Sequence, residues 1–161
     1  MLFPYLTICV TKKGYNLKMA NYKYIIDKTF SLWVPVIVWA LVIFLFSSKP
    51  TGTVTEIQVT DFIVKKSAHI IEYAIFTILI YRALCNSGVS KKESAIYSLI
   101  LALIYGASDE FHQSFTPGRD PKIRDVFFDT TGSLSAIFLI RNYLPKAPRE
   151  LRQLAEKLKI S

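Results

Sequence analysis

Four long apolar stretches, separated by short polar segments, dominate the chain. They cover about residues 30–46, 67–84, 95–113 and 125–143, and each is rich in Leu, Ile, Val and Phe. An α-helix rises about 1.5 Å per residue, so about 18 apolar residues match the roughly 30 Å of hydrocarbon in a bilayer. The pattern therefore predicts an all-α protein, a four-helix transmembrane bundle.

Turn-forming residues separate the predicted helices. Gly88 interrupts the second loop, Ser90 is a candidate N-cap for the third helix, and Thr116-Pro117-Gly118-Arg119 is a strong turn sequence. Proline presets one central dihedral of such a turn, and glycine accepts positive φ at the next. Pro35 lies near the predicted start of the first helix, where a missing N–H costs least, and Pro145 prevents the fourth helix from continuing.

The apolar stretches divide the chain into three segments. Residues 1–29 form a basic N-terminal segment, residues 30–144 the four-helix membrane domain, and residues 145–161 a basic cytoplasmic tail. The apolar patch near the N-terminus is too short to span a bilayer, and Met19 offers a second start, so residues 1–18 are expected to lie outside the native protein.

Leucines recur with helical spacing in the tail. Leu151, Leu154 and Leu158 would share one face of a helix, between basic residues. This spacing predicts a short amphipathic C-terminal helix. Such a helix either lies on the membrane surface or is a solvated tail helix, and the sequence leaves both readings open.

Composition excludes several classes of protein. The net charge is +8, but the lysines flank apolar runs and no basic stripe is interleaved with aromatics, so nucleic-acid binding is not expected. Cys9 and Cys85 are far apart and lack a partner at metal-ligand spacing, which excludes a disulfide framework and a zinc knuckle. The expected partner of the chain is the lipid bilayer.

Loop charges predict the orientation, because Lys and Arg are retained on the cytoplasmic side. Net charge is +4 before the first stretch, +2 around the second loop and +4 from Arg141 onward, against +1 in the first loop and −1 in residues 109–125. Both termini should therefore be cytoplasmic. The start of the second helix, the end of the third and the start of the fourth should face outward.

Acidic and histidine residues gather at these three outward-facing helix ends. The candidate catalytic residues are His69, Glu72, Asp109, Glu110, His112 and Asp129, and the candidate substrate-binding residues are Tyr73, Gln113, Arg119, Arg124 and Asp125. Several are related by i, i+3 or i, i+4, and so share helix faces. An acidic side chain within a span costs up to about 3 kcal/mol, so three helices that carry one at similar depth predict mutual pairing or a bound ligand or ion.

The chemistry of these side chains predicts a role for each candidate residue. His69 or His112 would carry a proton, and Glu72, Asp109 and Asp129 would orient it or hold a divalent cation, although the ligand set matches no standard zinc spacing. Arg119 and Arg124, with Lys122, would contact phosphate. On the fourth helix the small residues Gly132, Ser133 and Ala136 follow Asp129, a face that lets a neighbouring helix approach closely.

The same residues carry a resemblance to a known family. The matching pieces are Phe46-Ser47-Ser48-Lys49-Pro50, His69-x-x-Glu72-Tyr73, Asp109-Glu110-Phe111-His112-Gln113-x-Phe115-x-Pro117-Gly118-Arg119 and Asp125-x-x-x-Asp129-x-x-Gly132. Over roughly residues 33–141 the chain resembles the VanZ-like family, bacterial multi-pass membrane proteins named for an accessory protein of glycopeptide resistance. The resemblance implies a place in the cell envelope and a link to antibiotic resistance through teicoplanin susceptibility.

Three hypotheses for the polar cluster follow. The first is an outward-facing site that binds or modifies a polar lipid or another cell-envelope component, such as a cell-wall precursor headgroup. The second is a non-catalytic membrane module in which the cluster is a structural interhelix network. Ion translocation is disfavoured, because no acidic or histidine residue lies in the cytoplasmic half of the predicted spans. The sequence does not decide between turnover and binding, and it does not give the oligomeric state.

Overall fold

The computed structural model describes residues 12–49, 59–117 and 122–160. The chain divides into two compact units, Met1–Ser31 and Leu32–Ser161, which are described separately. The described residues form helices and turns, with no strand among them, so the predicted all-α class is confirmed.

The first helix, α1 (Lys12–Ser47), is longer than predicted and has Pro35 in its interior. The expectation that this proline lies near a helix start is therefore wrong, because the helix begins at Lys12. Proline has no N–H to donate, and its ring crowds the carbonyl four residues earlier, that of Ser31. Ser31 is also the last residue of the first unit.

The other three predicted stretches are helical as well. They are α2 (Val59–Asn86), α3 (Lys91–Gln113) and α4 (Ile123–Phe138). Because α2 begins well before the predicted residue 67, Lys65 and Lys66 belong to a helix and not to a loop. Ser90 is the N-cap of α3, as predicted, since its hydroxyl accepts a hydrogen bond from the N–H of Glu93 at 3.3 Å.

The end of the fourth predicted helix is irregular. A π-helical turn, η1 (Leu139–Tyr143), and a 3-10 turn, η2 (Leu144–Lys146), follow α4. Pro145 explains the change, because it cannot donate to the α-helical ladder and clashes with the carbonyl of Arg141. The predicted C-terminal helix is present as α5 (Arg149–Lys157).

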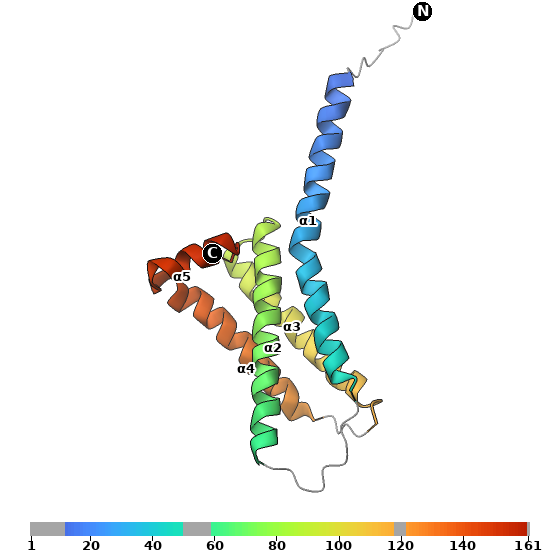
Figure 1. Cartoon of the computed structure of the whole chain (residues 1–161), viewed down its shortest axis with the longest axis vertical. Helices are drawn as coiled ribbons and strands as arrows, with labels where there is room; N and C mark the ends of the chain where they lie inside the picture. The colour runs from blue at the N-terminus through green and yellow to red at the C-terminus, as the bar shows by residue number, and fades with distance from the viewer. Residues whose placement is uncertain (1–11, 50–58, 118–121, 161) are drawn as a thin grey trace, which may run out of the picture. The chain divides into compact units, whose positions relative to one another are not determined.

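Within the unit Leu32–Ser161, the ends of the helices fall into two groups. The last turns of α1, the start of α2, the end of α3 and the start of α4 lie at one end, and α5 lies at the other end beside the last turn of α2 (Figure 1). Asn86 Nδ2 donates to the carbonyl of Lys159 at 2.8 Å, which ties α2 to the residues after α5.

Small residues and hydrogen bonds hold the helices together. A Cβ added at Gly132 would lie 2.2 Å from the carbonyl oxygen of Ile70, so the backbones of α4 and α2 are in direct contact, as the small-residue face predicts. Trp39 Nε1 donates to the carbonyl of Glu72 at 2.9 Å, and the Tyr105 hydroxyl donates to the carbonyl of Ala40 at 2.6 Å. These two bonds fix the second half of α1 against α2 and α3.

Two helical stretches in the described part of the chain are long and apolar enough to cross a membrane. They are Lys23–Ser47 and Ile63–Asn86. This property rests on their length and composition alone. The hydrophobic core between the helices includes Leu32, Ile43, Tyr73, Phe76 and Ile80.

Candidate functional site

A polar cleft opens at the end of the unit where α1 finishes and α2 begins. Its volume is about 230 Å³. The residues that line it are Ile43, Phe46 and Ser47 of α1, Lys65, Lys66, Ala68, His69 and Glu72 of α2, Asp109 of α3, and Asp125 of α4. All four helices therefore contribute to one cavity, and three of its walls carry a carboxylate.

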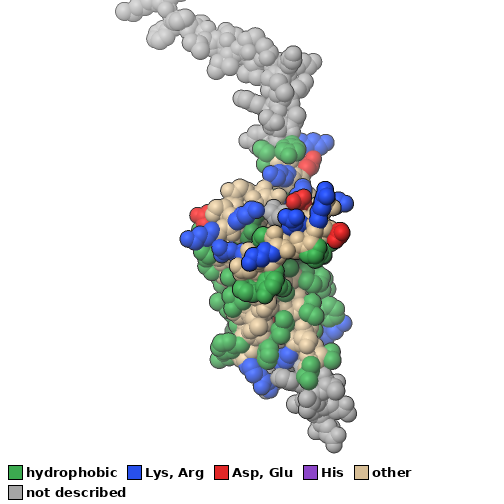
Figure 2. Space-filling view, turned by 90° about the vertical axis from the view of Figure 1, so that its left-hand side faces the viewer, with side chains coloured by type: hydrophobic (Ala, Val, Ile, Leu, Met, Phe, Trp, Pro, Cys, Tyr) green, Lys and Arg blue, Asp and Glu red, His purple; other side chains and the backbone are tan. Residues whose placement is uncertain are grey.

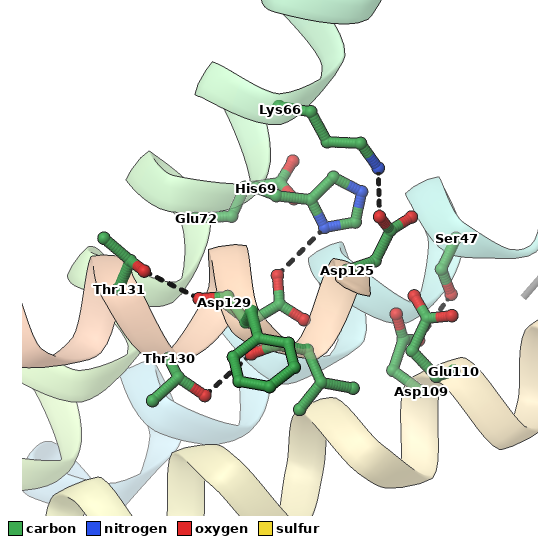
Figure 3. A network of polar contacts seen from close by, with 12 residues as sticks. Ser47, Lys66, His69, Glu72, Asp109, Glu110, Asp125, Asp129, Thr130 and Thr131 are labelled. Atoms are coloured by element: carbon green, nitrogen blue, oxygen red, sulfur yellow. Dashed lines mark hydrogen bonds and ion pairs between the residues drawn. The ribbon is translucent and has the colours of Figure 1, made fainter. Parts of the chain in front are cut away.

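A histidine and an aspartate pair across two helices beside this cleft. His69 Nδ1 of α2 lies 3.1 Å from Asp129 Oδ1 of α4, and Asp129 is 3% exposed (Figure 3). A carboxylate on Nδ1 fixes the orientation of the imidazole ring. The contact with Asp129 does not involve Nε2, the other ring nitrogen of His69.

The space for the Asp129 side chain is made by a glycine of α3. A Cβ at Gly106 would lie 3.3 Å from Asp129 Oδ2 and 3.3 Å from the Tyr73 ring, so both side chains pack against the bare backbone there. Tyr73 is fully buried, and its hydroxyl has no hydrogen-bond partner among the described residues.

Asp109 joins α1 to α3. Its Oδ1 accepts a hydrogen bond from the Ser47 hydroxyl at 2.6 Å, and its Oδ2 accepts one from Gln113 Nε2 at 2.8 Å. Ser47, Asp109 and Gln113 are all buried. Because each carboxylate oxygen has its own donor, the buried charge is satisfied on two sides.

Two further carboxylates make contacts at the start of α4, one in an ion pair and one in a hydrogen bond. Lys66 Nζ forms an ion pair with Asp125, which joins α2 to α4 (Figure 3). Glu110 Oε2 accepts from the backbone N–H of Lys122 at 3.0 Å, and Lys122 is the N-cap of α4. A carboxylate is favourable at a helix N-terminus, where the helix dipole is positive. Glu110 Oε1 is buried and has no hydrogen-bond partner in the part of the chain that the structure describes.

His112 lies apart from these contacts. Its Nε2 is 3.2 Å from the Ser48 hydroxyl, and its ring packs at a tilt of 33° against Phe44, with centroids 4.5 Å apart. His112 does not line the cleft. Of the two candidate proton carriers, His69 is therefore the one that the fold places at the cavity.

The structure places the candidate residues as follows. His69, Glu72, Asp109 and Asp125 line the cleft, and Asp129 and Gln113 bond directly to residues that line it. Tyr73 packs against the same buried region, and Glu110 holds the start of α4. Arg124 is exposed at the start of α4, and Arg119 lies outside the described residues.

Residues 30–144 match the family model described as VanZ/LLP1. The chain belongs to the VanZ/LLP1 family. Comparison with curated proteins and with solved structures finds no match. The resemblance seen in the sequence is thus confirmed, and the residues that line the polar cleft lie in the matched region.

Several residues of the VanZ/LLP1 site were not among the sequence candidates. Ser47 belongs to the piece Phe46-Ser47-Ser48-Lys49-Pro50 that resembles the family, and this membership was its only signal in the sequence. Lys65 and Lys66 are four and three residues before His69, so extending the helix backwards would have placed them on its face. Gly106 could have been noticed as a single glycine within an apolar helix.

The polar cleft contains both hydrogen-bond donors and hydrogen-bond acceptors, and both positive and negative charges. Among the described residues, no three His, Cys, Asp or Glu side chains lie close enough to hold a metal ion, so the divalent-cation hypothesis has no ligand set in this part of the VanZ/LLP1 protein. Lysines, a histidine and a hydroxyl face carboxylates across the cleft. Such a mixture can bind a polar group that has both anionic and hydrogen-donating atoms.

Proposed function

We propose that the chain is a multi-pass integral membrane protein with four spans, whose polar cleft binds the polar headgroup of a lipid or another cell-envelope component at the outer face. We further propose three segments: a basic N-terminal segment (1–29), the membrane domain (30–144) and a cytoplasmic tail (145–161). The observation that carries the binding function is the cleft itself, because side chains from all four helices converge on one cavity.

The distribution of apolar side chains supports four spans. On α3 the buried residues are small or polar, whereas the exposed ones include Ile96, Ile100, Leu103 and Ile104. On α4 the buried face holds Asp129, Gly132 and Ser133, and the exposed face holds Phe127, Leu134 and Phe138. Helices in water bury their large apolar residues, whereas membrane helices pack through small ones and turn large ones to lipid.

The outer surface supports the same interpretation. On the face shown in Figure 2, hydrophobic side chains form a band between two levels of Lys and Arg side chains. Exposed apolar patches of this extent are unusual for soluble proteins. A bilayer would cover the band and leave the charges at its two surfaces.

Loop charge supports the orientation. Nine Lys and Arg against three Glu lie in residues 82–93 and 141–161, which include the end of α2, the start of α3 and α5. This basic end belongs on the cytoplasmic side. The cleft, at the other end, then faces outward, and both termini are cytoplasmic.

The chemistry of the cleft favours a headgroup as ligand. Lys65 and Lys66 can attract an anionic oxygen, while Glu72 and Asp109 can accept hydrogen bonds from hydroxyl or amino groups. The His69 and Asp129 pair can hold or move a proton at His69 Nε2 during such binding. Phospholipid and cell-wall precursor headgroups both combine anionic and hydroxyl-bearing atoms.

A structural network is the second candidate function. Ser47 with Asp109, His69 with Asp129, and Lys66 with Asp125 each join two helices. Buried ionic groups can specify how helices pair, without any ligand. The Tyr73 hydroxyl and Glu110 Oε1 are buried without a hydrogen-bond partner in the described region, so the network leaves two polar atoms unsatisfied.

Glu72→Gln separates the two candidates. The full-length protein is purified in mild detergent, and lipids that copurify are identified by mass spectrometry. A binding site predicts that Glu72→Gln loses a copurifying lipid while its unfolding temperature is unchanged. Ser135→Ala, an exposed change on α4, is the control. Lower stability with the lipid retained would favour the network and contradict the binding proposal.

We also propose an effect on teicoplanin susceptibility. A susceptible bacterium that expresses the chain should need a higher teicoplanin concentration for growth arrest than one that expresses Glu72→Gln at an equal level. Equal susceptibility of the two strains would contradict this effect without touching the binding proposal.

A further inference from the structure

A second cleft lies at the opposite end of the same unit, between α5, the last turns of α2, the start of α3 and the turns η1 and η2. Its volume is about 340 Å³. The residues that line it are Tyr81, Lys91, Ile140, Arg141, Leu144, Pro145, Arg152, Glu156 and Ile160. We call it the basic cleft, because it has three cationic side chains and one carboxylate.

The three cations are available to a ligand. Lys91, Arg141 and Arg152 are exposed, and none of them forms an ion pair with a carboxylate in the described part of the chain. They come from three different elements, α3, η1 and α5. A group that carries negative charge on several oxygens can meet such cations from more than one side, and guanidinium groups match phosphate geometry.

An apolar groove adjoins the basic cleft. It also measures about 340 Å³, and it is lined by Ile78, Leu139, Ile140, Tyr143, Leu144, Ala147, Leu151, Leu154, Ala155, Leu158 and Ile160. Ile140, Leu144 and Ile160 line both cavities, so they form the wall between them. A charged site and an apolar site thus lie side by side.

Helix α5 contributes to both cavities with two different faces. Leu151, Leu154 and Leu158 have the spacing of one helix face and line the apolar groove. Arg152 and Glu156 are four residues apart and line the basic cleft. The amphipathic pattern of the tail helix therefore matches an amphiphilic ligand.

We propose that the basic cleft and the apolar groove together bind one anionic phospholipid, with its phosphate among Lys91, Arg141 and Arg152 and an acyl chain along α5. The charge of the cleft selects an anionic headgroup, and the groove beside it selects a lipid over a soluble phosphate. This site is separate from the polar cleft. It shares with the proposed function only the location of the chain in a membrane.

Native mass spectrometry of the delipidated full-length protein tests this site. Phosphatidylglycerol, phosphatidylcholine and glycerol phosphate are titrated separately. We expect one phosphatidylglycerol to bind at least tenfold more tightly than phosphatidylcholine, and glycerol phosphate not to bind at the same concentrations. Equal binding of the two lipids, or binding of glycerol phosphate as tight as that of the lipid, would overturn the proposal.

Charge variants with a matched control show where the lipid binds. Arg141→Gln with Arg152→Gln removes two lining cations, whereas Lys146→Gln with Arg149→Gln removes two cations of the same region that line neither cavity. We expect the lining pair to weaken phosphatidylglycerol binding by about 30-fold and the control pair by about twofold. Equal losses would mean diffuse attraction and would overturn the site.

The groove has its own test. Leu154→Ser changes an exposed position and should leave the fold intact. We expect it to weaken phosphatidylglycerol binding about fivefold, because less apolar surface is covered. Unchanged phosphatidylglycerol binding would contradict the proposal. So would a dimer of this protein that dissociates when lipid is added, because the groove would then bind a second copy and not an acyl chain. The proposed function is tested by a different measurement, the loss of a copurifying lipid in Glu72→Gln. The proposal for the polar cleft and the proposal for the basic cleft can therefore fail independently.

Discussion

The two ends of the unit Leu32–Ser161 use charge in opposite ways. At the polar cleft, acidic groups are buried on inner helix faces and bond across helices, as Asp109 and Asp129 do. At the basic cleft, Arg141 and Arg152 lie on the surface without an ion pair among the described residues. The difference teaches that buried charged groups at one end join helices, whereas the exposed cations at the other end make no such contact between the described helices.

The largest expected effect comes from Gly132, which sets the distance between α4 and α2. Gly132→Ala should cost about 3 kcal/mol or prevent folding, because the new methyl group meets the Ile70 carbonyl and the helices cannot separate without losing their contacts. Thermal unfolding in detergent measures it. Thr131→Ala, an exposed neighbour whose hydroxyl bonds only within α4, is the control. An unchanged unfolding temperature for Gly132→Ala would refute the close approach.

The buried pair at the polar cleft should show energetic coupling. Asp129→Ala is expected to lower the free energy of unfolding by about 2 kcal/mol, because His69 then loses its buried partner. In a double-mutant cycle, His69→Ala and Asp129→Ala should couple by about 1 kcal/mol. His69→Ala and Arg149→Gln, at opposite ends, should be additive. Additivity of the first pair would show that the contact contributes nothing.

A smaller loss is expected for a single buried hydrogen bond. Ser47→Ala removes the donor to Asp109 Oδ1 and should cost about 1 kcal/mol in unfolding free energy. Denaturation of the variant and of Ser135→Ala, measured side by side, gives the value. If Ser47→Ala were as stable as this exposed-site control, the contact between α1 and α3 would not contribute to stability.

The smallest effect on stability belongs to the basic end. Arg149→Gln with Arg152→Gln should change the unfolding free energy by less than about 0.5 kcal/mol, because both side chains are exposed. The same denaturation experiment applies. A loss as large as that of Ser47→Ala would mean that the cations at this end stabilise the fold, and the contrast between the two ends would disappear.

The sequence predicted most of the helices, because apolar stretches and turn residues are local signals. It also predicted that polar residues of three helices gather at one end, because loop charges and helical spacing together determine that placement. The full length of α1 was missed, since its first turns are polar and Pro35 suggested a helix start. Lys66 was missed because the start of α2 was predicted too late in the sequence.

The contacts inside the site depend on tertiary packing, which spacing alone does not give. His69 and His112 had equal standing in the sequence, and only the fold turns one toward the cleft and the other toward Phe44. Ser47 lies 62 residues before its partner Asp109, so no local pattern connects them. Glu110 was a catalytic candidate, and the structure shows it bonded to the backbone at the start of α4.

Accessibility labelling tests the central claim, an outward-facing polar cleft, most directly. With Cys9 and Cys85 replaced by serine, Lys65→Cys places a single thiol in the polar cleft, and Lys157→Cys places one on α5. A membrane-impermeant maleimide applied to intact cells should label Lys65→Cys, and it should label Lys157→Cys only after lysis. Labelling of Lys157→Cys from outside, with Lys65→Cys protected until lysis, would contradict the account.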